Sequence, residues 1–204
     1  MLNIHSIFKS IQGEGPFAGT PAVFVRFAGC NMLPRCSFCD TDYTTGAQMM
    51  EEQQIIDEIK RLAGGHIKLV VITGGEPFMQ GFGKLVYMIK TDSLPTIIQI
   101  ETNGTIYQPN FPYSFVHIVC SPKHISVADE FLKYTHILAW KFLVDETSED
   151  PAKGMGISPD WVFIQPIDTG DSSKNTGNIK RAVALCLENG YHLSLQLHKV
   201  ISIP

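Results

Sequence analysis

Gly29–Asp40 reads GCNMLPRCSFCD and places three of the chain's five cysteines, Cys30, Cys36 and Cys39, within ten residues. An odd number of cysteines, with three of them in one short segment, is typical of metal-binding or catalytic thiols in a reducing compartment. The same pattern disfavours a disulfide framework. The segment follows an apolar run that ends at Phe27, so the cysteines are expected in a loop directly after a strand.

Short apolar runs and amphipathic segments alternate along the rest of the chain. Strands are predicted at Ala22–Phe27, Lys68–Thr73, Thr96–Glu101, Phe115–Cys120, His136–Val144, Trp161–Gln165 and His192–His198. Helical apolar faces are predicted from Ile55, Ile56, Ile59 and Leu62, from Phe82, Leu85, Val86 and Ile89, and from Ile179, Ala182, Val183 and Cys186 before Gly190. Strands that are apolar almost throughout favour a parallel sheet covered on both faces. Since residues 103–113 are too short and proline-broken for a full helix, we expect an α/β fold: a partial, open (β/α) barrel in one domain over residues 1–204.

Composition excludes several function classes. The 204 residues are 44% hydrophobic and 18% charged, with a net charge of -4 and scattered basic residues, so no surface for a nucleic-acid backbone is expected. The first residues lack the pattern of a secretion signal, and no apolar run reaches the ~18 residues that cross a bilayer. We therefore expect a cytoplasmic protein with no membrane contact.

Polar or glycine-rich loops follow five of the predicted strands. They read GCNMLPRCSFCDT, GGEP, ETNG, SPK and QPID in chain order. In a (β/α) barrel, the carboxyl ends of the strands carry the active site. The five loops are therefore predicted to form one site.

The three clustered cysteines suit an iron-sulfur cluster better than a structural zinc ion. A structural zinc site needs four protein ligands, and Cys120 and Cys186 lie in a predicted strand and helix face, where a lone cysteine is a small buried hydrophobe. Three thiolates on a cubane cluster leave one iron without a protein ligand. That iron can be chelated by an amine and a carboxylate, which S-adenosylmethionine offers on its methionine end.

These residues resemble the signature of the radical S-adenosylmethionine superfamily, C-x3-C-x2-C with an aromatic residue before the last cysteine. Phe38 takes the aromatic place, although the first gap is wider here, with five residues between Cys30 and Cys36. The surrounding motifs, in order, are SIQGEG (10–15), FVRFAGCN (24–31), CDT (39–41), TGGEP (73–77), ETNGT (101–105), SPK (121–123), KF (141–142), QP (165–166) and QLHK (196–199). Together they resemble the 7-carboxy-7-deazaguanine synthase family of the queuosine pathway, which tolerates an altered first spacing.

The resemblance implies a function. One electron delivered to a 4Fe-4S cluster cleaves S-adenosylmethionine, and the resulting radical removes hydrogen from C6 of 6-carboxy-5,6,7,8-tetrahydropterin. The ring contracts, ammonia leaves, and 7-carboxy-7-deazaguanine forms. The family also implies a magnesium ion, a flavodoxin-like electron donor and a homodimer. No acid or base catalyst is assigned from the sequence.

The resemblance assigns roles to matching residues. The cluster ligands are Cys30, Cys36 and Cys39, and the magnesium ligand is Thr41, with Asp40 holding a bound water. The S-adenosylmethionine contacts are Phe38, Gly75, Glu76, Ser121, Lys123 and Gln165, with Glu76 gripping the amine. The substrate contacts are Gln12, Gly13, Glu14, Arg26, Thr73, His198 and the terminal carboxylate of Pro204. His198 is expected at the end of the last strand.

Two other functions remain open from the sequence. One is a small radical enzyme that activates a protein glycine, against which SIQGEG and the QLHK ending argue. The other is a non-enzymatic binding module stabilised by a metal ion. Iron content distinguishes the second from a cluster-dependent enzyme.

Overall fold

The computed structural model describes residues 1–92, 97–133 and 137–203. Within these residues, nine strands form one sheet. They are β1 (Leu2–Ile11), β2 (Pro21–Phe27), β3 (Gln48–Met50), β4 (Leu69–Gly74), β5 (Ile97–Thr102), β6 (His117–Cys120), β7 (Ile137–Val144), β8 (Val162–Pro166) and β9 (His192–Leu193). Their spatial order is β3-β1-β2-β4-β5-β6-β7-β8-β9. From β2 to β9 all neighbours are parallel, whereas β1 runs antiparallel to β2 and β3.

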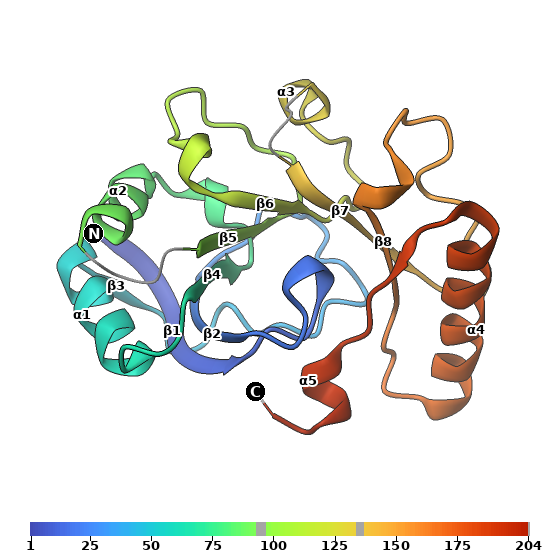
Figure 1. The fold of residues 1–204 in the computed structure, drawn as a ribbon, viewed down its shortest axis with the longest axis horizontal. Coiled ribbons are helices and arrows are strands. Elements are labelled where there is room, and N and C mark those ends of the chain that lie inside the picture. Colours follow the sequence, from blue (N-terminus) through green and yellow to red (C-terminus); the bar gives the residue numbers. More distant parts are fainter. Residues whose placement is uncertain (93–96, 134–136, 204) are drawn as a thin grey trace.

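The helices among the described residues are α1 (Glu52–Ala63), α2 (Gly83–Thr91), α3 (Asp129–Leu132), α4 (Ser172–Asn189) and α5 (Leu197–Val200). Helices α1, α2 and α4 lie around the outside of a curved, open sheet, whereas α5 lies near its open side (Figure 1). Short 3-10 turns occupy Gly15–Phe17, Pro77–Met79, Tyr113–Phe115 and Pro159–Trp161. α1 begins with a reciprocal capping box between Glu51 and Gln54 and ends at Gly64 in the left-handed conformation, which glycine adopts without steric cost. The predicted α/β fold, a partial and open (β/α) barrel, is confirmed.

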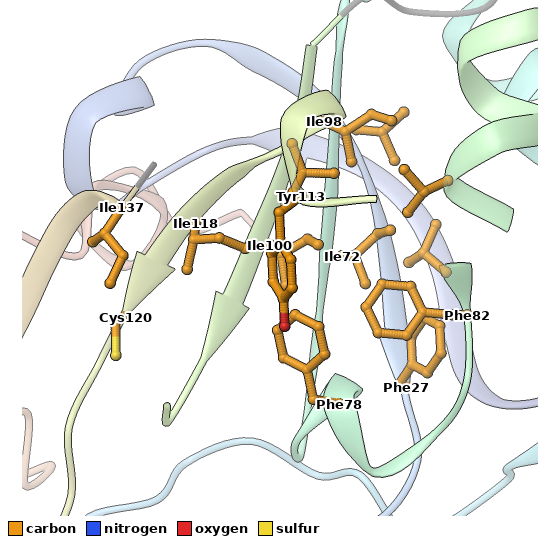
Figure 2. Close-up of a cluster of buried hydrophobic side chains, with 14 of the residues drawn as sticks. Phe27, Ile72, Phe78, Phe82, Ile98, Ile100, Tyr113, Ile118, Cys120 and Ile137 are labelled. Carbon is orange, nitrogen blue, oxygen red and sulfur yellow. The ribbon is translucent and has the colours of Figure 1, made fainter. Parts of the chain in front are cut away.

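The two faces of the sheet are distinguished by the alternation of side chains along each strand. One face packs beneath the helices and carries the larger core, including Val23, Val25, Phe27, Val70, Ile72, Ile98, Ile100 and Ile118. Figure 2 shows part of this core, where Phe27, Phe78 and Phe82 lie close together. The opposite face begins with a smaller apolar cluster, Ala22, Phe24, Leu69 and Val71, at the amino-terminal half of the strands. On this face, the residues that follow the smaller cluster along the strands therefore lie on the concave side of the sheet.

Several predicted elements differ from the structure. The strand β1 was not expected, because its polar residues interrupt the apolar run, yet it pairs with β2 along most of its length. The helix face assigned to α4 is displaced, since Ile179 is 43% exposed while Asn178 and Leu185 are buried. The predicted strand His192–His198 is wrong beyond Leu193, because the chain then leaves β8 and turns into α5.

Residues 103–113 form no long helix, as expected, and Gly190 ends α4 in the left-handed conformation. Three residues of the sequence-based predictions, Thr96, His136 and Pro204, lie outside the described residues.

Candidate active site

A cavity of about 450 Å³ opens at the carboxyl ends of the parallel strands. The predicted site residues that line it are Gln12, Glu14, Arg26, Cys30, Cys36, Phe38, Cys39, Thr41, Thr73, Gly75, Ser121, Lys123, Gln165 and His198. These residues come from the loop after β1, from the loop between β2 and β3, from the ends of β2, β4, β6 and β8 and the loops that follow them, and, for His198, from α5. The remaining predicted contacts, Gly13 and Glu76, do not line it, and Pro204 is outside the described residues.

Strand register explains why distant residues meet in this cavity. Arg26 of β2 is paired with Thr73 of β4, directly beyond the pair Phe24 and Val71 of the smaller apolar cluster. Leu143 of β7 is paired in the same way with Gln165 of β8. Because side chains alternate along a strand, the side chains on this one face change from apolar to polar toward the carboxyl ends of the strands.

Glu101 of β5 links several predicted substrate contacts, although the sequence analysis gave it no role. Its carboxylate accepts a hydrogen bond from Gln12 Nε2 at 2.9 Å and another from Thr73 Oγ1 at 2.8 Å. A third comes from Gln99 Nε2 at 3.0 Å. The motif ETNGT was the available signal, since a carboxylate at the end of a barrel strand is a candidate functional group. Glu101 therefore orients Thr73 on the neighbouring strand β4 and Gln12 in the loop after β1.

Glu14 is held by residues from two distant parts of the chain. Lys141 of β7 donates a hydrogen bond to Glu14 Oε2 and forms an ion pair with it. Gln196 Nε2 donates to Oε1 at 3.0 Å. Although burial opposes ionisation, Lys141 and Gln196 lower the pKa of Glu14 to about 2. The site thus contains a largely buried, ionised carboxylate.

Arg26 presents an unsatisfied donor. Its Nε is buried and has no hydrogen-bond partner among the described residues, and its Cζ lies 5.2 Å from the centre of the Phe8 ring. Burial lowers the pKa of Arg26, with Glu101 opposing that shift. A buried unpaired donor is costly, so a guanidinium in this state favours binding of an anionic ligand.

The loop between β2 and β3 carries the three clustered cysteines as free, half-buried thiols. A Cβ atom on Gly75 would stand 1.9 Å from the Gly29 carbonyl oxygen and 2.9 Å from Cys30 Cβ, so only glycine permits this close approach of the two loops. Within residues 1–92, 97–133 and 137–203, no three Cys, His, Asp or Glu side chains are gathered closely enough to hold a metal ion. The thiols nevertheless share one cavity and one loop, so their type and placement fit an iron-sulfur cluster.

Glu76 lies beneath the site and is fully buried. Its carboxylate accepts hydrogen bonds from Asn103 N at 2.7 Å, Thr102 Oγ1 at 2.8 Å and Phe78 N at 3.0 Å. Burial raises its pKa to about 7, against the effect of these donors. The structure therefore places Glu76 as a support that joins the GGEP and ETNG loops, and not as an open acceptor at the cavity surface.

The predicted S-adenosylmethionine contacts converge from β6, β8 and the cysteine loop. Lys123 Nζ donates to Ser121 Oγ at 2.7 Å and lies 5.8 Å from the centre of the Phe38 ring. Burial lowers the pKa of Lys123 to about 8. Gln165 is buried, and its Oε1 accepts a hydrogen bond from Ser194 Oγ at 3.0 Å.

The C-terminal segment closes one side of the cavity. Leu197 N donates to the Gly13 carbonyl oxygen at 3.0 Å, and His198 packs so tightly on Gly13 that a Cβ there would stand 2.1 Å from His198 Nδ1. His198 lies in α5 and not at the end of a strand, because β9 stops at Leu193. Lys199 pairs with Asp40 beside the last cysteine and with Asp168 after β8.

Comparisons with known proteins agree with this arrangement. The profile of the Radical SAM superfamily matches residues 24–135. A curated protein named 7-carboxy-7-deazaguanine synthase from Rickettsia prowazekii is 39% identical over 216 residues, which covers 99% of this chain and 88% of the relative. A protein of the same name from Rhodospirillum rubrum is 34% identical and covers 98% and 92%.

A solved structure has the same fold. The crystal structure of QueE from Escherichia coli aligns with a TM-score of 0.73 at 23% identity, covering 97% of this chain and 94% of that one. Among the described residues, no helix has the length and hydropathy of a membrane span. By its near full-length likeness to these relatives, the chain belongs to the 7-carboxy-7-deazaguanine synthase family of the radical SAM superfamily.

Proposed function

We propose that this protein is a 7-carboxy-7-deazaguanine synthase that converts 6-carboxy-5,6,7,8-tetrahydropterin to 7-carboxy-7-deazaguanine and ammonia in queuosine biosynthesis. The observation that supports it most is a single cavity whose wall contains three free thiols together with an ionised carboxylate, Glu14, and a guanidinium with an unpartnered Nε, Arg26. The thiols suit an iron-sulfur cluster, and the two charged groups suit a small ligand that carries both a carboxylate and N–H donors.

The cofactors are a 4Fe-4S cluster and S-adenosylmethionine, as membership of the family implies. Bound together, they supply the radical that removes hydrogen from the substrate. Cys30, Cys36 and Cys39 are the proposed cluster ligands. The proposed contacts to S-adenosylmethionine are Ser121, Lys123, Gln165, Phe38 and the backbone at Gly75, and the fact that they line the same cavity as the thiols supports this.

The substrate contacts follow from charge and hydrogen-bonding capacity. Arg26 is suited to the substrate carboxylate because its planar fork pairs with both oxygens. Glu14 is suited to the N–H groups of the pterin ring, while Gln12 and Thr73 are oriented by Glu101. Gly13 acts through its close packing on His198, which lines the cavity.

Further parts of the proposal rest on family resemblance. Thr41 is proposed as a magnesium ligand; it lines the cavity, and a hydroxyl oxygen suits that ion. The terminal carboxylate of Pro204 is proposed to bind the substrate. A flavodoxin-like electron donor, a homodimer, a cytoplasmic location and a single domain over residues 1–204 complete the proposal.

The decisive experiment is anaerobic incubation of the cluster-reconstituted protein with S-adenosylmethionine, a reductant and the carboxypterin. Mass analysis should detect 7-carboxy-7-deazaguanine, and a parallel assay should detect ammonia. Brown protein with about four irons is expected. A colourless zinc protein would support the metal-stabilised module, and S-adenosylmethionine cleavage without carboxypterin turnover would support a different radical enzyme.

A further inference from the structure

Lys141 and Glu14 form a buried ion pair in the wall of the cavity, across 127 residues of sequence. Lys141 is 6% exposed and lies in β7, whereas Glu14 lies in the turn after β1. Gln196 holds the other carboxylate oxygen from the C-terminal segment at 3.0 Å. Both charged residues line the cavity. The two oxygens of the Glu14 carboxylate are thus held by Lys141 and by Gln196.

The ionisation of Glu14 depends on its surroundings, and Lys141 has the strongest effect among those that oppose the effect of burial. Burial by itself raises the pKa of a carboxyl group, and here Lys141 reverses that direction, through charge and through its hydrogen bond. His198 of α5 contributes in the same direction, less strongly. Lys123 after β6 also faces the pair, and Glu101 of β5 and Asp40 of the cysteine loop act on Lys141.

An ionised carboxylate in this place selects for a particular ring edge. The 2-amino-4-oxopyrimidine ring of a pterin presents a ring N–H beside an exocyclic amine, and these two donors match the two oxygens of a carboxylate. The corresponding 2,4-dioxo ring presents a carbonyl oxygen in place of the amine and so repels the carboxylate. A protonated carboxyl group accepts fewer hydrogen bonds and loses this discrimination.

We propose that Lys141 is a positioning and specificity-determining residue, which holds Glu14 ionised and oriented so that the site prefers a 2-amino-4-oxopyrimidine ring over its 2-oxo counterpart. This proposal rests on the proposed function and names the residue behind its substrate preference. The motif KF at 141–142 therefore has a role that the sequence did not reveal, since Lys141 acts on the substrate through Glu14.

The test compares anaerobic binding of 6-carboxypterin and 6-carboxylumazine to the cluster-loaded protein by fluorescence, from about pH 5 to about pH 7.5. This range lies between the usual pKa of a glutamate and the values of about 8–9 that buried unpaired glutamates reach. The unaltered protein should prefer the pterin by tenfold or more, with a preference that changes little with pH. Lys141→Met should lose most of that preference at low pH and regain part of it as the pH rises, because Glu14 then begins to ionise.

Three further variants isolate the cause. Lys141→Arg should keep the preference because the cation remains. Glu14→Gln combined with Lys141→Met should bind both ligands with no pH-dependent preference, and it remains informative if Lys141→Met folds poorly because it leaves no unpaired buried charge. Lys60→Met removes a lysine of a surface ion pair with Asp92 and should behave as the unaltered protein.

Two results would overturn the inference in different ways. If folded Lys141→Met kept a full, pH-independent preference for the pterin, Lys141 would have no part in selecting the ring, even though the proposed function stood. If the unaltered protein bound neither carboxypterin nor carboxylumazine, the proposed function would fail and the inference would fail with it.

Discussion

Glu76 offers the sharpest test of how the site is built, because the sequence and the structure assign it different roles. The TGGEP motif predicts a contact to the amine of S-adenosylmethionine. The structure instead has its buried carboxylate accept hydrogen bonds from Phe78 N, Thr102 Oγ1 and Asn103 N. We therefore expect substitution of Glu76 to reduce the free energy of unfolding.

The magnitude follows from the number of donors left without a partner. Glu76→Ala orphans the backbone N–H groups of Phe78 and Asn103, at about 1–3 kcal/mol each, whereas the Thr102 hydroxyl can rotate. The expected loss is therefore about 2–6 kcal/mol. Glu76→Gln keeps one acceptor and turns an amide N–H toward the Asn103 N–H, so its expected loss is smaller, about 1–3 kcal/mol.

The measurement is urea unfolding followed by circular dichroism, at matched cluster content and under anaerobic conditions, with the exposed Glu188→Gln as the control. Burial raises the pKa of Glu76 from 4.5 in the unfolded chain to about 7, so the folded state binds the extra proton between these values. The contribution of Glu76 to stability therefore falls as the pH rises through that window, and the difference from Glu76→Gln should show it. If Glu76→Gln unfolded like the unaltered protein yet lost affinity for S-adenosylmethionine, Glu76 would be a ligand contact and the structural reasoning would be refuted.

Three other changes test separate parts of the site. Cys36→Ser should remove iron and activity together because a serine oxygen is a poor iron-sulfur ligand. Cys186→Ser, on the buried face of α4, should keep both, and a bleached Cys186→Ser protein would show that the cluster ligands are wrongly assigned. Thr41→Ala should slow carboxypterin turnover with little change in iron content, and equal rates with and without magnesium would contradict a metal role. Lys199→Met removes the ion pairs of Lys199 with Asp40 and Asp168 and should speed hydrogen exchange at the Leu197 amide by up to about fivefold. This factor is the equivalent of about 1 kcal/mol for exposed ion pairs. Unchanged exchange would show that these pairs do not hold the C-terminal segment.

The sequence determined the fold class, and most of the site residues inferred from the sequence line the cavity. Apolar strands followed by polar loops indicate parallel strands buried on both faces, and the carboxyl ends of such strands necessarily lie together. That geometry explains how Arg26 and Thr73, which lie far apart in sequence and which the family resemblance assigned to the substrate, come together, and the structure pairs them directly in the sheet. The three clustered cysteines suggested the superfamily although their first gap is wider than usual, and the neighbouring motifs then identified the family.

Tertiary structure decided which polar groups are open to a ligand and which support the loops. A motif gives residue types but not their hydrogen-bond partners, so the sequence did not show that the Glu76 carboxylate, predicted to contact a ligand, accepts from three donors of the chain. Alternating leucines after His192 looked like a strand, yet β9 ends at Leu193. The ion pair of Lys141 with Glu14 joins residues 127 positions apart, and such contacts arise from strand order and packing, which local sequence patterns do not encode.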